Sequence, residues 1–410
     1  MKSLAVSVPF PVIAKTLSGL EDALASELQE LGINAELLHR AVRFTGSNED
    51  LYRANYCSRL AIRFLKFITS FEVVKQEDLY DQVKAIGWEE FITENQSFAI
   101  DAVINQSAFT NTLFVAQKAK DAIADRFRTI YGIRPSVDLE HPDLRINIHL
   151  QKQQCTISLD SSGHSLHKRG YRKRTWEAPI SEVLAAGLIR LSGWDQQTPL
   201  YDPMCGSGTI PMEAALLASA TPAGYFRQEF GFMKWRDFDA TIWERVKGEA
   251  NSLIKPVTVP IRGSDTARQA IHAAKINIRK THLGPDVQIQ VANFHATKPP
   301  FENGLMVMNP PYDERIQLDD GIAFYRSLGD TLKHLYSGWE AWIISSDLKA
   351  LKFFGLKPSR KIPLFNGPLE CRFVKFDLYT GAKEEDRRPK DEGRGTRDEG
   401  RETSNPLKGE

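Results

Sequence analysis

Segments of helical and of strand character alternate from about residue 178 to residue 379, and this alternation limits the fold more than any other feature of the sequence. Apolar runs of strand length are followed by stretches with apolar residues at helical spacing. The order predicts an α/β fold with a mostly parallel sheet covered on both faces, whose ligands bind at the carboxyl ends of the strands. The expected elements are a helix at 179–192, a strand that ends at Asp202, a helix, a Phe- and Trp-rich insertion at 225–243, a strand that ends at Asp265, a helix, strands at 287–291 and 304–308, a helix at 321–336, a strand at 340–345 and a final strand at 372–379.

The first of these strand ends is followed by a glycine-rich turn, DPMCGSGT at 202–209, and a helical pattern begins at about Thr209. Gly206 and Gly208 allow a ligand to approach the backbone, and the free N–H groups of a helix N-terminus favour an anionic group such as a carboxylate. A simple tight turn has the same glycines. The Lys and Ser/Thr of a phosphate-binding loop do not follow, and Pro211 stands where the dinucleotide fingerprint has its third glycine.

Two further strand ends carry polar residues. Asp265 is placed to accept hydrogen bonds from ribose hydroxyls, or to cap the helix that follows, and both roles can hold at once. Asn293 lies in the segment VANFHA at 291–296, directly after the next expected strand.

The sequence Asn309-Pro310-Pro311-Tyr312 follows the strand at 304–308. The Asn309 amide oxygen and the Pro310 carbonyl can both accept hydrogen bonds from a planar exocyclic amine, while Tyr312 offers a flat face to a base. The two prolines keep the turn rigid. An ordinary strand-to-loop turn is the alternative, since Asn and Pro are common turn formers.

In this order, the motifs resemble those of S-adenosylmethionine-dependent methyltransferases that act on exocyclic amines. The whole chain resembles the RNA methyltransferases that carry an N-terminal THUMP domain, in particular the guanine 2-amino methyltransferases of large-subunit ribosomal RNA. The segments that carry the resemblance are TLSGLEDALASELQELG (16–32), DLRINIHLQKQQCTISLDSSG (143–163), HKRGYRKRTWEAPI (167–180), DPMCGSGT (202–209), NPPYDER (309–315) and LFNGPLECRF (364–373).

The resemblance implies a set of site residues. Asn309, Pro310 and Tyr312 would hold the reacting amine and its base. A sulfonium methyl is already activated, so the site mainly aligns the amine and no strong base is needed. The family favours Asp where Asn293 stands, and an Asn oxygen accepts from the adenine amine without a charge. The residues expected around the cofactor are Asp202, Cys205, Gly206, Gly208 and Thr209 for its methionine part, Asp265 for its ribose, and Asn293 and Phe294 for its adenine.

By the same resemblance the chain divides into five parts, and RNA is its expected partner. The tail has charges of both signs and almost no apolar residues, so we expect it to be disordered. The expected parts are a ferredoxin-like region at 1–60, a THUMP RNA-binding domain at 61–162, a basic linker at 163–178, a Rossmann-like methyltransferase domain at 179–381 and the tail at 382–410.

The net charge of +1 does not point to nucleic acid, but the linker is locally basic. Cations interleaved with aromatic residues are typical of a surface that binds an RNA backbone and stacks a base. A solvated linker is the alternative. The expected RNA-binding residues are Lys168, Arg169, Tyr171, Arg172 and Lys173, together with Arg315 beyond the Asn-Pro-Pro-Tyr turn.

Several classes of protein are disfavoured. No stretch approaches the roughly 20 apolar residues of a membrane span, so a cytoplasmic location is expected. The four cysteines lack metal-ligand spacing, and we expect no metal site. A DNA adenine methyltransferase shares the Asn-Pro-Pro-Tyr turn but lacks the lead-in module. A transfer-RNA guanine methyltransferase stays open, as does a non-catalytic RNA-binding or ribosome assembly protein, which the intact motifs disfavour. The oligomeric state is not determined by the sequence.

Overall fold

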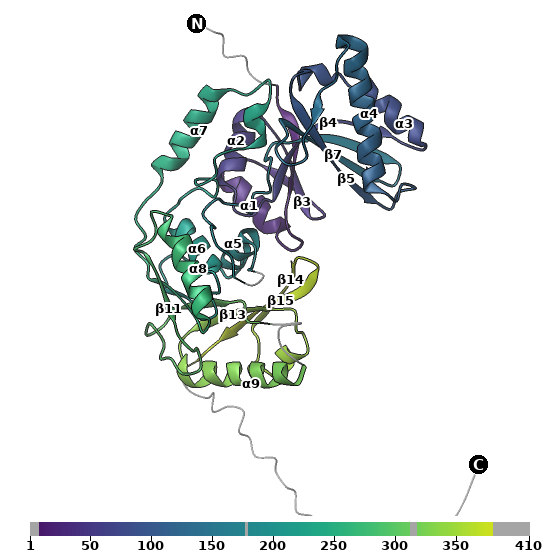
Figure 1. The fold of residues 1–410 in the computed structure, drawn as a ribbon. Coiled ribbons are helices and arrows are strands. Elements are labelled where there is room, and N and C mark those ends of the chain that lie inside the picture. The colour runs from purple at the N-terminus through teal and green to yellow at the C-terminus, as the bar shows by residue number, and fades with distance from the viewer. Residues whose placement is uncertain (1–7, 177–178, 312–317, 380–410) are drawn as a thin grey trace, which may run out of the picture.

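The structure is a computed structural model that describes residues 8–176, 179–311 and 318–379. Two sheets divide it into an N-terminal module, residues 8–160, and a C-terminal domain, residues 179–377, which lie above and below one another in Figure 1. The predicted tail at 382–410 lies outside the described residues. No helix in the described ranges is long and apolar enough to cross a membrane.

The N-terminal module is built on one eight-stranded sheet with the order β2-β3-β1-β4-β8-β7-β5-β6. Strand β4 pairs antiparallel with both β1 and β8, so the ferredoxin-like and THUMP-like parts share a continuous sheet. Their predicted boundary at residue 60 falls just before this strand. The elements are β1 (Phe10–Lys15), α1 (Glu21–Glu30), β2 (Ala35–Leu38), β3 (Ala41–Gly46), α2 (Asn48–Cys57), β4 (Arg63–Glu72), α3 (Gln76–Ala85), η1 (Trp88–Glu90), β5 (Ser97–Asn105), α4 (Thr112–Tyr131), β6 (Ser136–Val137), β7 (Leu144–Gln151) and β8 (Gln154–Asp160).

The C-terminal domain has a seven-stranded sheet with the order β11-β10-β9-β12-β13-β15-β14. Its strands are parallel from β11 to β13, and β15 is antiparallel to both β13 and β14. The predicted α/β fold class is confirmed. The elements are α5 (Glu182–Leu191), β9 (Leu200–Asp202), α6 (Thr209–Ala218), η2 (Gly231–Lys234), α7 (Ala240–Ser252), β10 (Ile261–Asp265), α8 (Arg268–Arg279), β11 (Val287–Val291), β12 (Leu305–Met308), α9 (Leu318–Leu335), β13 (Glu340–Ser345), η4 (Ala350–Phe353), β14 (Arg360–Asn366) and β15 (Leu369–Asp377).

The course of the chain fixes where this sheet can bind a ligand. From β9 the chain runs outward to β10 and β11, and it then returns to place β12 on the other side of β9. Helices α5, α6 and α8 pack on one face of the sheet, whereas α9 and η4 pack on the other. Because the connections leave β9 and β12 on opposite faces, a crevice opens at the carboxyl ends of these two strands.

The strand β14 was not predicted. It forms a hairpin with β15 at the edge of the sheet, and its burial pattern does not alternate cleanly between buried and exposed residues. A strand without that alternation gives no period-of-two signal in the sequence.

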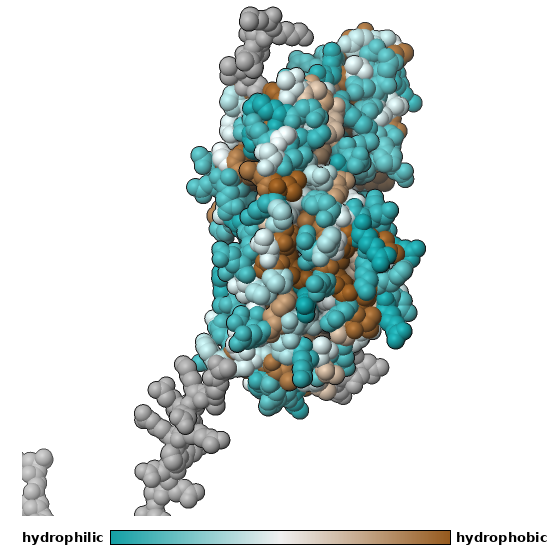
Figure 2. All heavy atoms as spheres, turned by 90° about the vertical axis from the view of Figure 1, so that its left-hand side faces the viewer, coloured by the Kyte–Doolittle hydropathy of each residue, from teal (hydrophilic) through white to brown (hydrophobic). Residues whose placement is uncertain are grey.

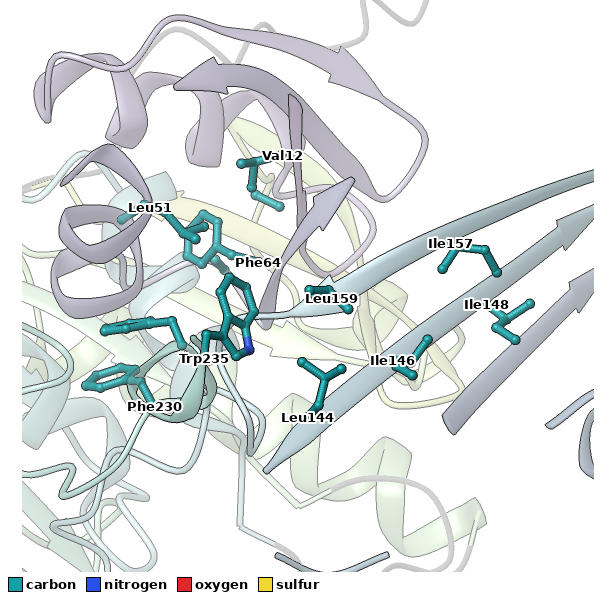
Figure 3. Packing of buried hydrophobic residues seen from close by; sticks show 14 of the residues in the cluster. Val12, Leu51, Phe64, Leu144, Ile146, Ile148, Ile157, Leu159, Phe230 and Trp235 are labelled. Carbon is teal, nitrogen blue, oxygen red and sulfur yellow. The ribbon is translucent and has the colours of Figure 1, made fainter. Parts of the chain in front are cut away.

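The Phe- and Trp-rich insertion belongs to the C-terminal half of the sequence but packs in the core of the N-terminal module. Phe230, Phe232 and Trp235 are buried in one cluster with Phe64 and Leu144. Figure 3 shows Trp235 beside Phe64, with the side chains of the THUMP-like strands on its other side. Helix α7 continues this contact along α2, next to which it lies in Figure 1.

A second contact between the two parts runs in the opposite direction. Leu20, just before α1, is fully buried in the hydrophobic cluster of the C-terminal domain. It lies over Gly187 of α5, where a Cβ atom would come within 2.7 Å of the Leu20 side chain. Each part therefore inserts apolar side chains into the core of the other. On the face shown in Figure 2, hydrophobic residues gather across the middle of the molecule and hydrophilic residues dominate its upper part.

We expect the insertion to be essential for the stability of the N-terminal module. Phe232 is fully buried and its ring stacks on Tyr52 at a centroid distance of 4.3 Å. Truncation to Ala should lower the free energy of unfolding by about 3 to 5 kcal/mol, because a large cavity would remain. Urea unfolding measures the change. Phe353→Ala, at a ring that is 43% exposed on η4, is the matched control and should cost much less. Equal effects of the two substitutions would contradict the packing argument.

Candidate active site

A cavity of about 350 Å³ lies at the carboxyl ends of β9, β10, β11 and β12. This is the crevice that the strand order opens, and its volume is within the range of small-molecule sites. The residues that line it are Trp176, Pro179, Ile180, Asp202, Pro203, Met204, Cys205, Gly206, Ser207, Thr209, Ile210, Asp265, Thr266, Ala267, Asn293, Phe294, His295, Asn309, Pro311 and Phe324.

The glycine-rich loop after β9 forms the floor of this cavity. The Cys205 N–H donates to the Ser264 carbonyl at 2.9 Å, and the Gly208 N–H donates to the Cys205 carbonyl at 2.8 Å. Gly206 and Gly208 have φ angles of 53° and 83°, a left-handed conformation that favours glycine. Gly208 does not line the cavity: a Cβ atom there would lie 3.1 Å from the Ala274 side chain, so this glycine lets α6 start close against α8.

Asp265 connects the loop to the start of α8. One of its oxygens accepts a hydrogen bond from the Gly206 N–H at 3.0 Å, and the other accepts from the Ala267 N–H at 2.9 Å. The capping alternative is wrong, because Ala267 is the N-cap of α8 and the helix has no side-chain cap; Asp265 instead binds the N–H of that residue, just before the helix. Each oxygen keeps a lone pair for a further donor, and the side chain is only partly buried.

Two polar side chains under the loop are buried with few partners. Asp202 is 1% exposed and accepts a hydrogen bond from the Met204 N–H at 3.1 Å. Burial raises the pKa of its carboxyl well above the usual range, although that hydrogen bond opposes the shift. Ser207 is 5% exposed, and its hydroxyl has no hydrogen-bond partner among the described residues. Buried polar atoms without partners are rare in native proteins, so this hydroxyl indicates a place for a bound polar group.

Asn309 directly follows β12, the neighbour of β9 in the sheet, and lines the cavity. Its side-chain oxygen is buried and accepts no hydrogen bond from any described residue. An amine in the cavity could donate to it without displacing a protein partner. Pro311 lines the cavity, whereas Pro310 does not, although the role predicted for Pro310 involves only its carbonyl. Tyr312 and Arg315 lie outside the described residues.

The segment after β11 contributes three neighbours to the wall. The Asn293 side-chain oxygen accepts a hydrogen bond from the His295 N–H at 3.0 Å, which fixes the turn. Phe294 is 2% exposed and stacks on Tyr336, so the cavity meets little of its ring. His295 lies 2.7 Å from the Thr331 hydroxyl, and burial lowers its pKa.

The structure corrects the RNA-binding prediction for two linker residues. Arg169 and Tyr171 are 1% and 2% exposed, respectively. The Tyr171 hydroxyl donates to Glu213 of α6 at 2.9 Å, and Arg169 forms an ion pair with the same carboxylate at 3.6 Å. A buried cation that is paired in this way is not available to a phosphate. Their role is to join the linker to the C-terminal domain.

Arg172 is also held by the protein. It forms an ion pair with Glu182 at 2.9 Å and donates to the Thr209 hydroxyl at 2.8 Å, so it fixes the first residue of α6. Lys168 and Lys173 are exposed, and their RNA-binding role stays a prediction.

Twelve of the residues that line the cavity were not predicted as site residues, and Ser207, Trp176 and Phe324 show why. Ser207 lies inside the glycine-rich loop, where its position between two glycines was the available signal. Trp176 is an aromatic residue of the basic linker, but the sequence does not show that it reaches the cavity. Phe324 belongs to α9, and nothing in a helical pattern marks it. Among the described residues, no group of three or more His, Cys, Asp and Glu side chains is arranged to hold a metal ion.

Comparison with known families identifies the protein class. The model of a methyltransferase domain described as RMKL-like matches residues 169–375, which is half of the chain. The chain belongs to this methyltransferase family. A THUMP domain matches residues 75–160, and an RlmL ferredoxin-like domain matches residues 11–65.

Individual relatives agree with the family. The Synechocystis protein slr0064, whose name provisionally assigns it as an RNA methyltransferase, is 38% identical over 90% of this chain and 97% of its own length. The ribosomal RNA large subunit methyltransferase K/L of Methylococcus capsulatus is 40% identical over 88% of this chain and 50% of its own length. The chain therefore spans about half the length of that enzyme. The crystal structure of SMU.472 complexed with SAH, also provisionally named a methyltransferase, has a TM-score of 0.83 at 29% identity and covers 91% of this chain and 99% of its own.

S-adenosylmethionine is the cofactor of this methyltransferase, and the cavity suits it. The free N–H groups at the start of α6 and the unpartnered Ser207 hydroxyl are donors for a carboxylate. The lone pairs of Asp265 are acceptors for ribose hydroxyls. No cation among the described residues offsets the burial of the Asp202 carboxyl, and a positively charged ligand would favour its ionised form.

We expect Asp265→Asn to weaken S-adenosylmethionine binding by roughly 1.5 to 3 kcal/mol, the worth of hydrogen bonds to a charged group. The new amide has only one acceptor oxygen. It can therefore keep the hydrogen bond from the Gly206 N–H or the one from the Ala267 N–H, but not both. Isothermal titration calorimetry measures the affinity. Asp286→Asn, at the amino end of β11 and away from the cavity, is the control. Unchanged affinity in the Asp265 variant would remove this carboxylate from the site.

Asn309→Ala should nearly abolish methyl transfer and leave cofactor affinity close to normal, since the expected bonds of this amide are to the reacting amine. Turnover with radiolabelled cofactor measures methyl transfer, and calorimetry measures cofactor affinity. Asn303→Ala, an exposed asparagine before the same strand, is the control. If turnover of the Asn309 variant stays within about tenfold of the wild type, a loss of only ~1.4 kcal/mol, the amine-holding role is wrong.

Proposed function

We propose that the protein transfers a methyl group from S-adenosylmethionine to the exocyclic 2-amino group of a guanine in large-subunit ribosomal RNA. The observation that carries the proposal is the buried oxygen of Asn309, which has no hydrogen-bond partner among the described residues and shares one cavity with Asp265 and the glycine-rich loop. An acceptor without a donor at this place suits an amine substrate. The names of the relatives support large-subunit ribosomal RNA as the substrate. The motif resemblance supports guanine as the base.

In the proposed reaction, the bound cofactor supplies a methyl group that is already activated on sulfur. The oxygens of Asn309 and of the Pro310 carbonyl accept hydrogen bonds from the amine and direct its lone pair out of the ring plane. The amine nitrogen forms its bond to the methyl carbon as the carbon–sulfur bond breaks, and the extra proton passes to water. Tyr312 serves as the surface on which the base stacks. Alignment at near-attack distance supplies most of the rate enhancement.

The remaining site roles complete the proposal. Asp202, Cys205, Gly206 and Thr209 surround the methionine part of the cofactor, and Asp265 binds its ribose. Asn293 and the edge of Phe294 border the adenine. The target guanine must leave its helix or lie in a loop to reach the cavity. A ribosomal RNA substrate also implies that the protein works in the cytoplasm.

Two other functions differ from this one in testable ways. A transfer-RNA guanine methyltransferase would use the same site on another RNA. A non-catalytic assembly protein would bind RNA without transferring a methyl group, and the unpartnered Asn309 oxygen in a cofactor-sized cavity disfavours it.

We expect the purified protein to form N2-methylguanosine when large-subunit ribosomal RNA from a strain that lacks the gene is supplied with labelled S-adenosylmethionine. Nucleoside mass spectrometry identifies the product. Small-subunit ribosomal RNA, transfer RNA and DNA from the same strain are the controls and should accept little label. Methylation of transfer RNA alone would favour the second candidate, and a methyladenosine product would overturn the choice of base. Binding of RNA without any methyl transfer would favour the assembly protein.

A further inference from the structure

Helix α8 has a face of exposed basic side chains. Arg268, His272, Lys275 and Arg279 are all exposed and follow one another at spacings of four, three and four residues, which places them on one side of the helix. From Arg268 to Arg279 this row is roughly 16 Å long at the usual rise of an α-helix. The helix contains no acidic residue.

The linker contacts the other side of this helix. The buried Asn277 side chain accepts hydrogen bonds from the Lys173 and Arg174 N–H groups at 2.8 and 3.0 Å, and it donates to the Arg174 carbonyl at 2.9 Å. These bonds fix the linker backbone against α8 and leave the row of basic side chains uncovered by the linker. We call Arg268, His272, Lys275 and Arg279 the α8 surface.

The arginines and the lysine of the α8 surface are not neutralised by carboxylates among the described residues. Within the described residues, Arg268, Lys275 and Arg279 form no ion pair, and neither do Lys173 and Arg174. Some exposed arginines elsewhere are paired with carboxylates, such as Arg43 with Glu36 and Arg245 with Glu49, whereas others such as Arg40 and Arg134 have no ion pair in the described part of the chain. The α8 surface is distinguished by the position of its basic side chains on one side of a helix that contains no acidic residue.

The amino end of this row lies next to the active site, because Ala267, directly before α8, lines the cavity. A strand of RNA on the α8 surface would therefore pass the mouth of the cavity.

We propose that the α8 surface is where the C-terminal domain binds the phosphate backbone of the RNA beside the target base. This inference rests on the proposed function, and it assigns the backbone contact to α8 in place of the buried Arg169 and Tyr171. Phosphate contacts by unpaired cations release counterions and give a salt-dependent affinity. The buried arginines contribute none of this dependence, since their charges are already paired within the protein.

The test is the double variant Lys275→Gln/Arg279→Gln in the full chain. Both residues are exposed, so the fold should persist, and an unchanged affinity for S-adenosylmethionine in calorimetry checks this. Binding to deproteinised large-subunit ribosomal RNA is measured at a series of salt concentrations. We expect affinity to fall about tenfold near physiological salt, and the slope of log K against log salt to become shallower by roughly 1.5.

The matched control is Lys352→Gln/Lys357→Gln, which removes two exposed lysines from the η4 side of the sheet, opposite to α8. It should leave affinity and slope near the wild-type values. An equal loss in both double variants would mean that the effect comes from the net charge and not from the α8 surface, and it would overturn the inference. Wild-type affinity and slope in the α8 variant, in a protein that still methylates RNA, would overturn it and leave the proposed function standing. If the wild-type chain neither binds nor methylates RNA, both proposals are wrong.

Discussion

Burial of the aromatic side chains at 230–243 in the N-terminal module is the contact on which the relative position of the two parts depends. The insertion leaves the C-terminal domain after α6, crosses to the module, and returns to β10. Phe232 and Trp243 lie against Tyr52 of α2, so α2 has its core partner in another region of the sequence. With Leu20 buried in the opposite direction, the two parts hold each other through two hydrophobic cores. Separate domains joined by a flexible linker would lack such contacts.

In the linker, burial and ion pairing determine which basic side chains stabilise the protein and which are exposed to a ligand. Arg227, from the start of the insertion, donates to the carbonyls of Ser165 and Lys168 at 3.1 and 2.8 Å, and burial lowers its pKa to about 10. Arg169 points inward to Glu213, and removal of one partner of such a buried pair is expected to cost several times more than the loss of a surface ion pair. The linker thus uses its arginines to fix its own path. The cations that remain for a ligand are those with no carboxylate in reach.

In the active site, too, some polar groups are hydrogen-bonded within the protein and others are left for a ligand. The loop after β9 is held by Asp265, whose two oxygens bind the backbone on both sides of the cavity floor. The Ser207 hydroxyl and the Asn309 oxygen are left without partners among the described residues, and both residues line the cavity that a methyl donor and an amine would share. Because each is buried, pairing with a ligand regains the hydrogen bond that folding left unmade.

The sequence by itself determined the α/β class, the strand ends that carry Asp202, Asp265 and Asn309, and the methyltransferase family, because period, turn residues and motif order are local properties of the chain. It did not determine that Arg169 is buried or that Trp176 reaches the cavity. The carboxylate that pairs with Arg169 is 44 residues away, and a basic run has the same composition whether it faces solvent or a buried glutamate. Burial and ion pairing depend on contacts between segments that are far apart in the chain. The packing of α6 against the linker, and of the insertion against the N-terminal module, therefore decides which cations are paired within the protein and which stay exposed to a ligand.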